Sequence, residues 1–107
     1  MPDAPQTIQH DPEWLVSIEM GLSHREFFRI LPKAYAGVEY TVAERLVRFE
    51  DAEKSVEIRL SEEWPVQLGP SLVLPRTQVD FAFFGHSEAE REAFLWHFKM
   101  HYFRGGG

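Results

Sequence analysis

The segment Ser87-Glu-Ala-Glu-Arg-Glu-Ala-Phe-Leu-Trp-His-Phe-Lys-Met-His-Tyr-Phe-Arg104 decides the fold, because it predicts a long terminal helix to which the rest of the chain must fit. Ser87 can cap the first turn with its hydroxyl. Glu90 lies three residues later and can accept a hydrogen bond from the Ser87 amide, which is the spacing of a capping box. Three glycines, 105–107, follow Arg104 and end the helix.

The apolar residues of this segment form two separate stripes when they are placed at steps of about 100° around a helix. The first stripe consists of Phe94, Leu95, Phe98 and Tyr102. The second stripe consists of Ala89, Ala93, Trp96, Met100 and Phe103. A helix cannot bury both stripes against one flat sheet. The second stripe is therefore either covered by another helix or by the loops of residues 62–76, or it is a contact surface with Ala93, Trp96, Met100 and Phe103 as interface residues.

A second capping box, Ser23 to Glu26, predicts another helix upstream. Pro32 falls inside it and predicts a kink or an end near Leu31, with Gly37 as the stop if the helix resumes. Before this helix, residues 13–22 alternate apolar and polar side chains with a period of two. That pattern favours a strand, and a short helical turn is the alternative.

Between the two helices the pattern predicts four strands in two hairpins. In the first hairpin, residues 38–50 pair with residues 56–61, and a slip in the alternation predicts a β-bulge near 43–46. Trp64-Pro65 and Gly69-Pro70 break the pattern. The second hairpin then joins residues 71–74 to residues 78–84.

The predicted fold is α+β, in the order (β)-α-β-β-β-β-α, with an antiparallel four-stranded sheet covered on one face by two helices. Residues 13–104 form one domain, residues 1–12 a flexible tail and residues 105–107 a flexible glycine tail. The order of elements resembles that of TATA-box-binding-protein-like folds. The resemblance is one of topology and implies two helices on one sheet, not DNA binding.

The composition excludes several classes of function. The net charge of −6 argues against binding to nucleic acid, which relies on Lys and Arg to neutralise phosphates. The chain has no cysteine, which excludes disulfides and thiolate sites. No apolar run is long enough to span a membrane, and no secretory signal is visible. We therefore expect a soluble cytoplasmic protein without a cofactor.

His97 and His101 are the only residues whose spacing suggests a metal site. They lie four residues apart, so both imidazoles project from one side of the terminal helix. The signal is weak, because Phe98 stands where the metalloprotease motif has a glutamate. Glu90 is too far along the helix to share an ion with both histidines.

Three functional hypotheses remain, in this order. The first is a non-enzymatic interaction or regulatory domain that self-associates, as a homodimer, through the terminal helix, because the sequence carries no catalytic motif. The second is a small-ligand binding module with an apolar pocket between the terminal helix and the sheet. The third is a metal-binding protein that uses His97 and His101.

Overall fold

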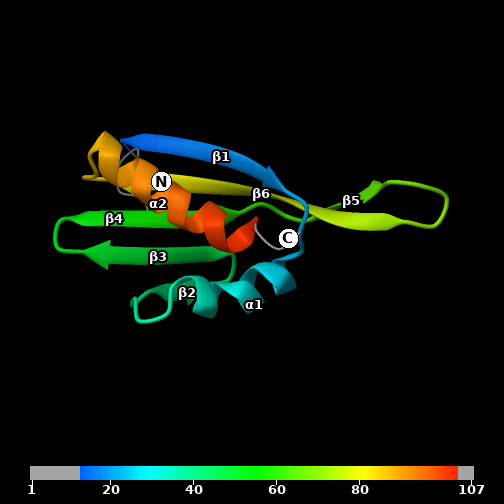
Figure 1. Cartoon of the computed structure of the whole chain (residues 1–107), viewed down its shortest axis with the longest axis horizontal. Coiled ribbons are helices and arrows are strands. Elements are labelled where there is room, and N and C mark those ends of the chain that lie inside the picture. Colours follow the sequence, from blue (N-terminus) through cyan, green and yellow to red (C-terminus); the bar gives the residue numbers. More distant parts are fainter. Residues whose placement is uncertain (1–12, 104–107) are drawn as a thin grey trace, which may run out of the picture.

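A computed structural model describes residues 13–103 of the chain. In it a six-stranded antiparallel sheet is covered on one face by two helices (Figure 1). The elements are β1 (Trp14–Met20), α1 (His24–Ala34), β2 (Thr41–Ala43), β3 (Leu46–Asp51), β4 (Lys54–Leu60), β5 (Trp64–Gln67), β6 (Val73–Phe84) and α2 (Glu88–Tyr102). The predicted α+β class is confirmed. The sheet has six strands where a four-stranded sheet was predicted, because β1 joins it and five strands lie between the helices instead of four.

The strand order is β1-β6-β4-β3-β2, so the first strand of the sheet pairs with the last one in the chain. β6 pairs along one edge with β1 and along the other with β4, and its first residues pair with β5. Within residues 13–22, Trp14–Met20 form a strand, as predicted, and the helical alternative is excluded. β5 and the start of β6 project beyond the sheet as a two-stranded arm (Figure 1).

The stretch 38–50 forms two strands instead of one bulged arm. β2 and β3 pair directly, with Ala43 opposite Leu46, and Glu44 and Arg45 make the turn. Glu44 has a φ of 56°, a left-handed conformation that is uncommon outside glycine. The slip in the alternation predicted a bulge here, and no glycine or asparagine marks the turn in the sequence. The predicted bulge near 43–46 is wrong.

The predicted second hairpin is also wrong, because residues 73–84 form one strand of 12 residues that passes through Pro75. Pro75 lies directly opposite Pro65 of β5. Two prolines fit opposite each other only at a pair that exchanges no hydrogen bonds, where the missing amide protons would point away from the partner strand. Neither proline therefore interrupts the ladder, and Trp64-Pro65 begins a strand instead of breaking one.

Helix α1 begins at Ser23, as predicted, and the Ser23 hydroxyl accepts a hydrogen bond from the Glu26 amide at 3.1 Å. This is one half of the predicted capping box, and the Glu26 carboxylate pairs with Arg29 instead. It does not end near Leu31. It runs through Pro32 to Ala34, and Gly37 follows in the next turn with a φ of 81°. Pro32 lies in the last turn of the helix and is exposed, so its ring faces solvent.

The core lies between the helices and the sheet. Register places Val16, Phe81, Ile58 and Val47 side by side across four strands. The three last named are fully buried. Phe98 of α2 packs edge to face on Phe81 with ring centroids 4.8 Å apart, and Phe27 of α1 stacks on Tyr102 of α2 at 5.1 Å. The core thus fixes both helices on the same face.

The other face of the sheet has no helix over it, yet it holds a fully buried carboxylate. Glu57 of β4 is 0% exposed. It lies between the guanidinium groups of Arg48 and Arg59, which bind one carboxylate oxygen each. The pairing with both arginines compensates for the loss of water around the buried charge.

The turn into α2 requires glycine at position 85. Gly85 has a φ of 78°, and a Cβ atom there would lie 2.9 Å from the carbonyl oxygen of Glu53. The close approach brings the β3–β4 turn beside the start of α2. The predicted tails at 1–12 and 105–107 lie outside the described residues, and the domain boundaries remain predictions.

Candidate functional site

Helix α2 is held in place at three points along its length. At its start, Ser87 and Glu90 form the complete predicted capping box, and Lys54 of β4 binds the Glu90 carboxylate at 2.6 Å. In its middle, His97 Nε2 lies 2.6 Å from the carbonyl oxygen of Ala34. Near its end, the Tyr102 hydroxyl donates to the carbonyl oxygen of Phe27 at 3.0 Å. These contacts fix which side of the helix faces outward.

The first stripe of α2 faces the core, as the sequence predicts. Phe98 and Tyr102 are buried and stack on each other at 4.2 Å, and Phe94 and Leu95 are half-buried beside them. The first stripe is therefore the side of α2 that packs on the sheet.

The second stripe is exposed to solvent. Trp96 is 65% exposed, Met100 39% and Phe103 44%, and Ala89 and Ala93 are also exposed. Neither α1 nor the residues 62–76 cover it. On β1, next to the start of α2, the ring of Trp14 is 49% exposed and lies under the Arg91 guanidinium at 4.4 Å.

Charged residues flank the second stripe along one edge. Glu92 and Lys99 are seven residues apart, close to two helical turns, so they lie on the same side of the helix. Both are exposed, and neither forms an ion pair within residues 13–103. The first turn of α2 is acidic and its last turn basic, which matches the helix macrodipole.

The structure brings His97 and His101 together, with ring centroids 4.5 Å apart, but gives each a main-chain partner. His97 binds the Ala34 carbonyl oxygen, and Nδ1 of His101 lies 3.0 Å from the carbonyl oxygen of His97 itself. In the described part of the chain, no three metal-binding side chains gather in a group that could hold a metal ion.

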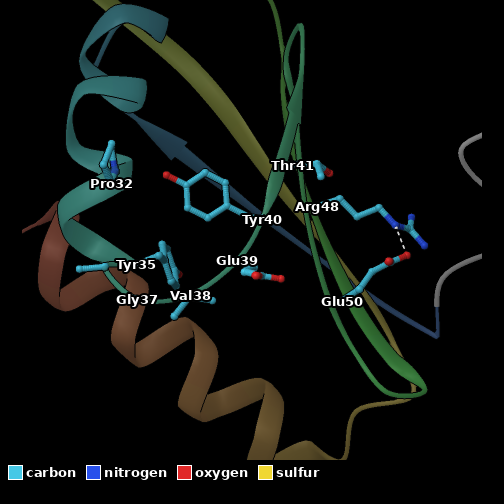
Figure 2. A pocket seen from close by; sticks show the side chains of 10 residues that line it. Pro32, Tyr35, Gly37, Val38, Glu39, Tyr40, Thr41, Arg48 and Glu50 are labelled. Carbon is cyan, nitrogen blue, oxygen red and sulfur yellow. Dashed lines mark hydrogen bonds and ion pairs between the residues drawn. The ribbon is translucent and has the colours of Figure 1, made fainter.

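Two neighbouring pockets lie beside the segment that follows α1. The larger has a volume of about 490 Å³ and is lined on its two sides by Pro32 and Tyr40 and by the Arg48–Glu50 ion pair (Figure 2). The smaller, of about 310 Å³, lies between α2 and the strands β3 and β4. Tyr35 lines both pockets.

The hydroxyl of Tyr35 is buried and has no hydrogen-bond partner among residues 13–103. Burial raises the pKa of Tyr35 above its ordinary value, so the hydroxyl stays protonated. A buried hydroxyl without a partner costs free energy. No sequence motif indicates this group.

The arm formed by β5 and the start of β6 is a second exposed apolar surface. Residues 64–75 contain no charged residue. The large apolar side chains exposed there are Trp64, Leu68, Leu72, Val73 and Leu74. This uncharged run is visible in the sequence, but its prolines indicate a break in the strand pattern, so β5 was not predicted.

No protein-family model matches the chain, and no curated protein or solved structure matches it significantly. The resemblance of its element order to TATA-box-binding-protein-like folds therefore has no support from a structural match. No helix in the described residues is long and apolar enough to cross a membrane.

Proposed function

We propose that this protein is a non-enzymatic interaction domain that binds a second copy of itself through α2, in the cytoplasm. The observation that carries the proposal is the exposure of the second stripe, with Trp96 65% exposed at its centre. Soluble monomers rarely leave aromatic and methionine side chains together in one exposed patch, and such patches are typical of protein interfaces.

A second copy is the favoured partner because the second stripe complements itself. A twofold axis that crosses α2 at Trp96 makes the two α2 helices antiparallel. Phe103 and Ala89 lie seven residues on either side of Trp96, so the large ring of each copy meets the small side chain of the other. Met100 lies four residues after Trp96 and Ala93 three residues before it, so these two side chains of opposite copies also meet, with an offset of one residue. Closed twofold dimers are also the commonest oligomers.

Charge supports the same arrangement. Glu92 lies four residues before Trp96 and Lys99 three residues after it, on one edge of the stripe. The twofold axis therefore brings Glu92 of each copy within about one turn of Lys99 of the other, since a turn contains about 3.6 residues. Antiparallel helices also place opposite macrodipole ends side by side.

Sedimentation velocity tests this proposal. Wild type is expected to be a dimer, and Trp96→Glu combined with Met100→Glu a folded monomer. Loss of a central tryptophan costs an interface about 2 kcal/mol or more, a rise of about 30-fold or more in the dissociation constant. Trp64→Glu, an exposed tryptophan on the arm, is the matched control and keeps the dimer. A wild type that stays monomeric at millimolar concentration contradicts the proposal.

Charge reversal tests the antiparallel arrangement separately. Glu92→Lys and Lys99→Glu each place like charges across the axis and weaken the dimer. The double variant restores opposite charges and is expected to recover wild-type affinity. A double variant that is no better than the single ones contradicts the antiparallel arrangement.

The second proposed function is small-ligand binding, and one specific observation favours it. The pocket of about 310 Å³ lies between α2 and the sheet, where the sequence hypothesis places a ligand, and its volume is at the lower end for ligand sites. The two functions use different sides of α2, so they are compatible.

A further inference from the structure

The pocket between α2 and the sheet has an aromatic base. Tyr35, Phe49 and Phe94 line it, and their ring centroids are 4.7, 5.5 and 5.6 Å apart in pairs. Val56 completes the apolar lining. Three aromatic rings that meet around one pocket favour ligands with an apolar body, and the faces of such rings attract cations.

The charged groups around the pocket are all acidic. Glu39, Glu50 and Asp51 line it, and no lysine or arginine does so. Glu50 is paired with Arg48 at 2.9 Å. Glu39 and Asp51 form no ion pair within the described residues, and Lys54, the cation near Asp51, is bound to Glu90. The pocket therefore presents two carboxylates, of Glu39 and Asp51, that form no ion pair in the described part of the chain, and Lys54 lies opposite Asp51 in the strand pairing.

Two histidines around the pocket add further hydrogen-bonding groups. His86 and His97 line it, and each has one ring nitrogen facing a main-chain carbonyl oxygen. A carbonyl oxygen only accepts, so the nitrogen facing it carries the proton, and the other nitrogen of a neutral ring is an acceptor.

We propose that this pocket binds a small organic ammonium ion with an aromatic or branched apolar body. The ammonium group lies between Glu39 and Asp51, where both charge and acceptor atoms suit its N–H donors. The apolar body lies on the rings of Tyr35, Phe49 and Phe94. This inference rests on the second proposed function, which it deepens by naming the class of ligand.

Isothermal titration of the full chain with three probes of similar shape tests the inference. The probes are 2-phenylethylammonium, 2-phenylethanol and phenylacetate, which differ in charge. The ammonium ion is expected to bind about tenfold tighter than the alcohol, which corresponds to a cation–π contact plus partly screened charge attraction. The carboxylate is expected to bind most weakly, and added salt weakens only the ammonium ion.

Variants locate the site. Glu39→Gln combined with Asp51→Asn is expected to remove the preference for the ammonium ion and to leave binding of the alcohol unchanged. Glu19→Gln combined with Glu62→Gln, two exposed carboxylates outside the pocket, is the matched control. Val38→Trp fills the pocket from its exposed rim and is expected to abolish binding of all three probes, while thermal unfolding shows that the variant is folded.

The outcomes separate the two levels of the proposal. If the alcohol binds as tightly as the ammonium ion and the Glu39/Asp51 variant changes nothing, the ligand class is wrong and the pocket remains a ligand site. If none of the three probes binds at millimolar concentration, both the ligand class and the second proposed function are wrong.

Discussion

Arg59 donates two hydrogen bonds to one carboxylate oxygen of Glu57, from Nε at 3.2 Å and from Nη2 at 2.9 Å. Arg48 binds the other oxygen. Glu57 is fully buried, whereas the side chains of Arg48 and Arg59 are 33% and 29% exposed. The arginines can turn towards water, but the carboxylate cannot.

This asymmetry predicts unequal costs on the two sides of the network. Replacement of both arginines by methionine leaves a buried charge without a partner and is expected to lower the free energy of unfolding by about 3–5 kcal/mol. Glu57→Met leaves two arginines that solvent can reach and is expected to cost about 1 kcal/mol. Urea denaturation measures both values. Equal losses would show that the buried carboxylate is not the vulnerable partner.

The contact between His97 and Ala34 predicts a stabilising role for a residue whose spacing suggested a metal ligand. The contact joins α2 to the end of α1 at 2.6 Å. His97→Ala removes the donor from this carbonyl and is expected to cost about 1–2 kcal/mol of unfolding free energy. His101→Ala is the control, because its hydrogen bond lies within α2, and it is expected to cost clearly less. A larger loss for His101→Ala would contradict the assignment.

The same two variants test the metal hypothesis. We expect the purified, untagged protein to contain no stoichiometric zinc by elemental analysis, because a metal at His97 must displace its bond to the Ala34 carbonyl oxygen. One zinc per chain, lost in both variants, would contradict this expectation.

The pair of Lys54 and Glu90 predicts a pH dependence at the start of α2. The hydrogen bond from Lys54, and then that from the Ser87 amide, lowers the pKa of Glu90 from 4.5 to about 2. A lowered pKa in the folded state means that the charged form stabilises the fold. That stabilisation is fully present above pH 4.5 and is lost as the pH falls from about 4.5 through about 2.

Thermal unfolding of wild type and Glu90→Gln across this range measures the effect. The Tm of the variant is expected to lie below that of wild type at neutral pH, and the difference is expected to shrink as the pH falls towards about 2. Glu62→Gln, at an exposed carboxylate outside the helix, is the control and has no such trend. A difference that stays constant with pH would contradict the role of the Glu90 charge.

The arm is expected to contribute little to the stability of the rest of the chain. Among the strands, β5 pairs with β6 alone, and an isolated two-stranded hairpin is marginal in water. Replacement of residues 67–73 by Asn-Gly is expected to change the free energy of unfolding by less than about 1 kcal/mol. Phe81→Ala, in the half of β6 that lies in the main sheet, is expected to cost about 3–5 kcal/mol. Urea denaturation compares them, and a severe loss on shortening would show that the arm packs on the domain.

The features that the sequence predicted correctly depend on local chemistry. Each helix starts at a serine whose hydroxyl accepts a hydrogen bond from the amide of the glutamate three residues later. These serines are Ser23 and Ser87. The alternation of apolar and polar residues around Val16 and Ile18 predicts a strand, whichever strand pairs with it. The class of the fold follows from these elements.

The features that the sequence failed to predict depend on distant partners or on unusual backbone. Pro75 is compatible with a strand because, opposite Pro65, it lies at a position that exchanges no hydrogen bonds with β5. The turn at Glu44 uses a left-handed conformation without glycine. The exposure of Trp96 was left open, because it depends on where α1 lies. The unpartnered hydroxyl of Tyr35 depends on the packing of the whole core and has no local signal.

The position of β6 in the sheet has a consequence for synthesis of the chain on the ribosome. β1 leaves the ribosome first, but its partner in the sheet, β6, is made more than fifty residues later, as the pairing of Ile18 with Val79 shows. One edge of β4 also stays unpaired until β6 has been made. Until then only the local β2–β3–β4 meander is paired. Helix α1 still lacks its contacts with α2, and β1 has exposed edges prone to wrong pairing. Completion of the sheet is therefore confined to the last stage of translation or to the time after release.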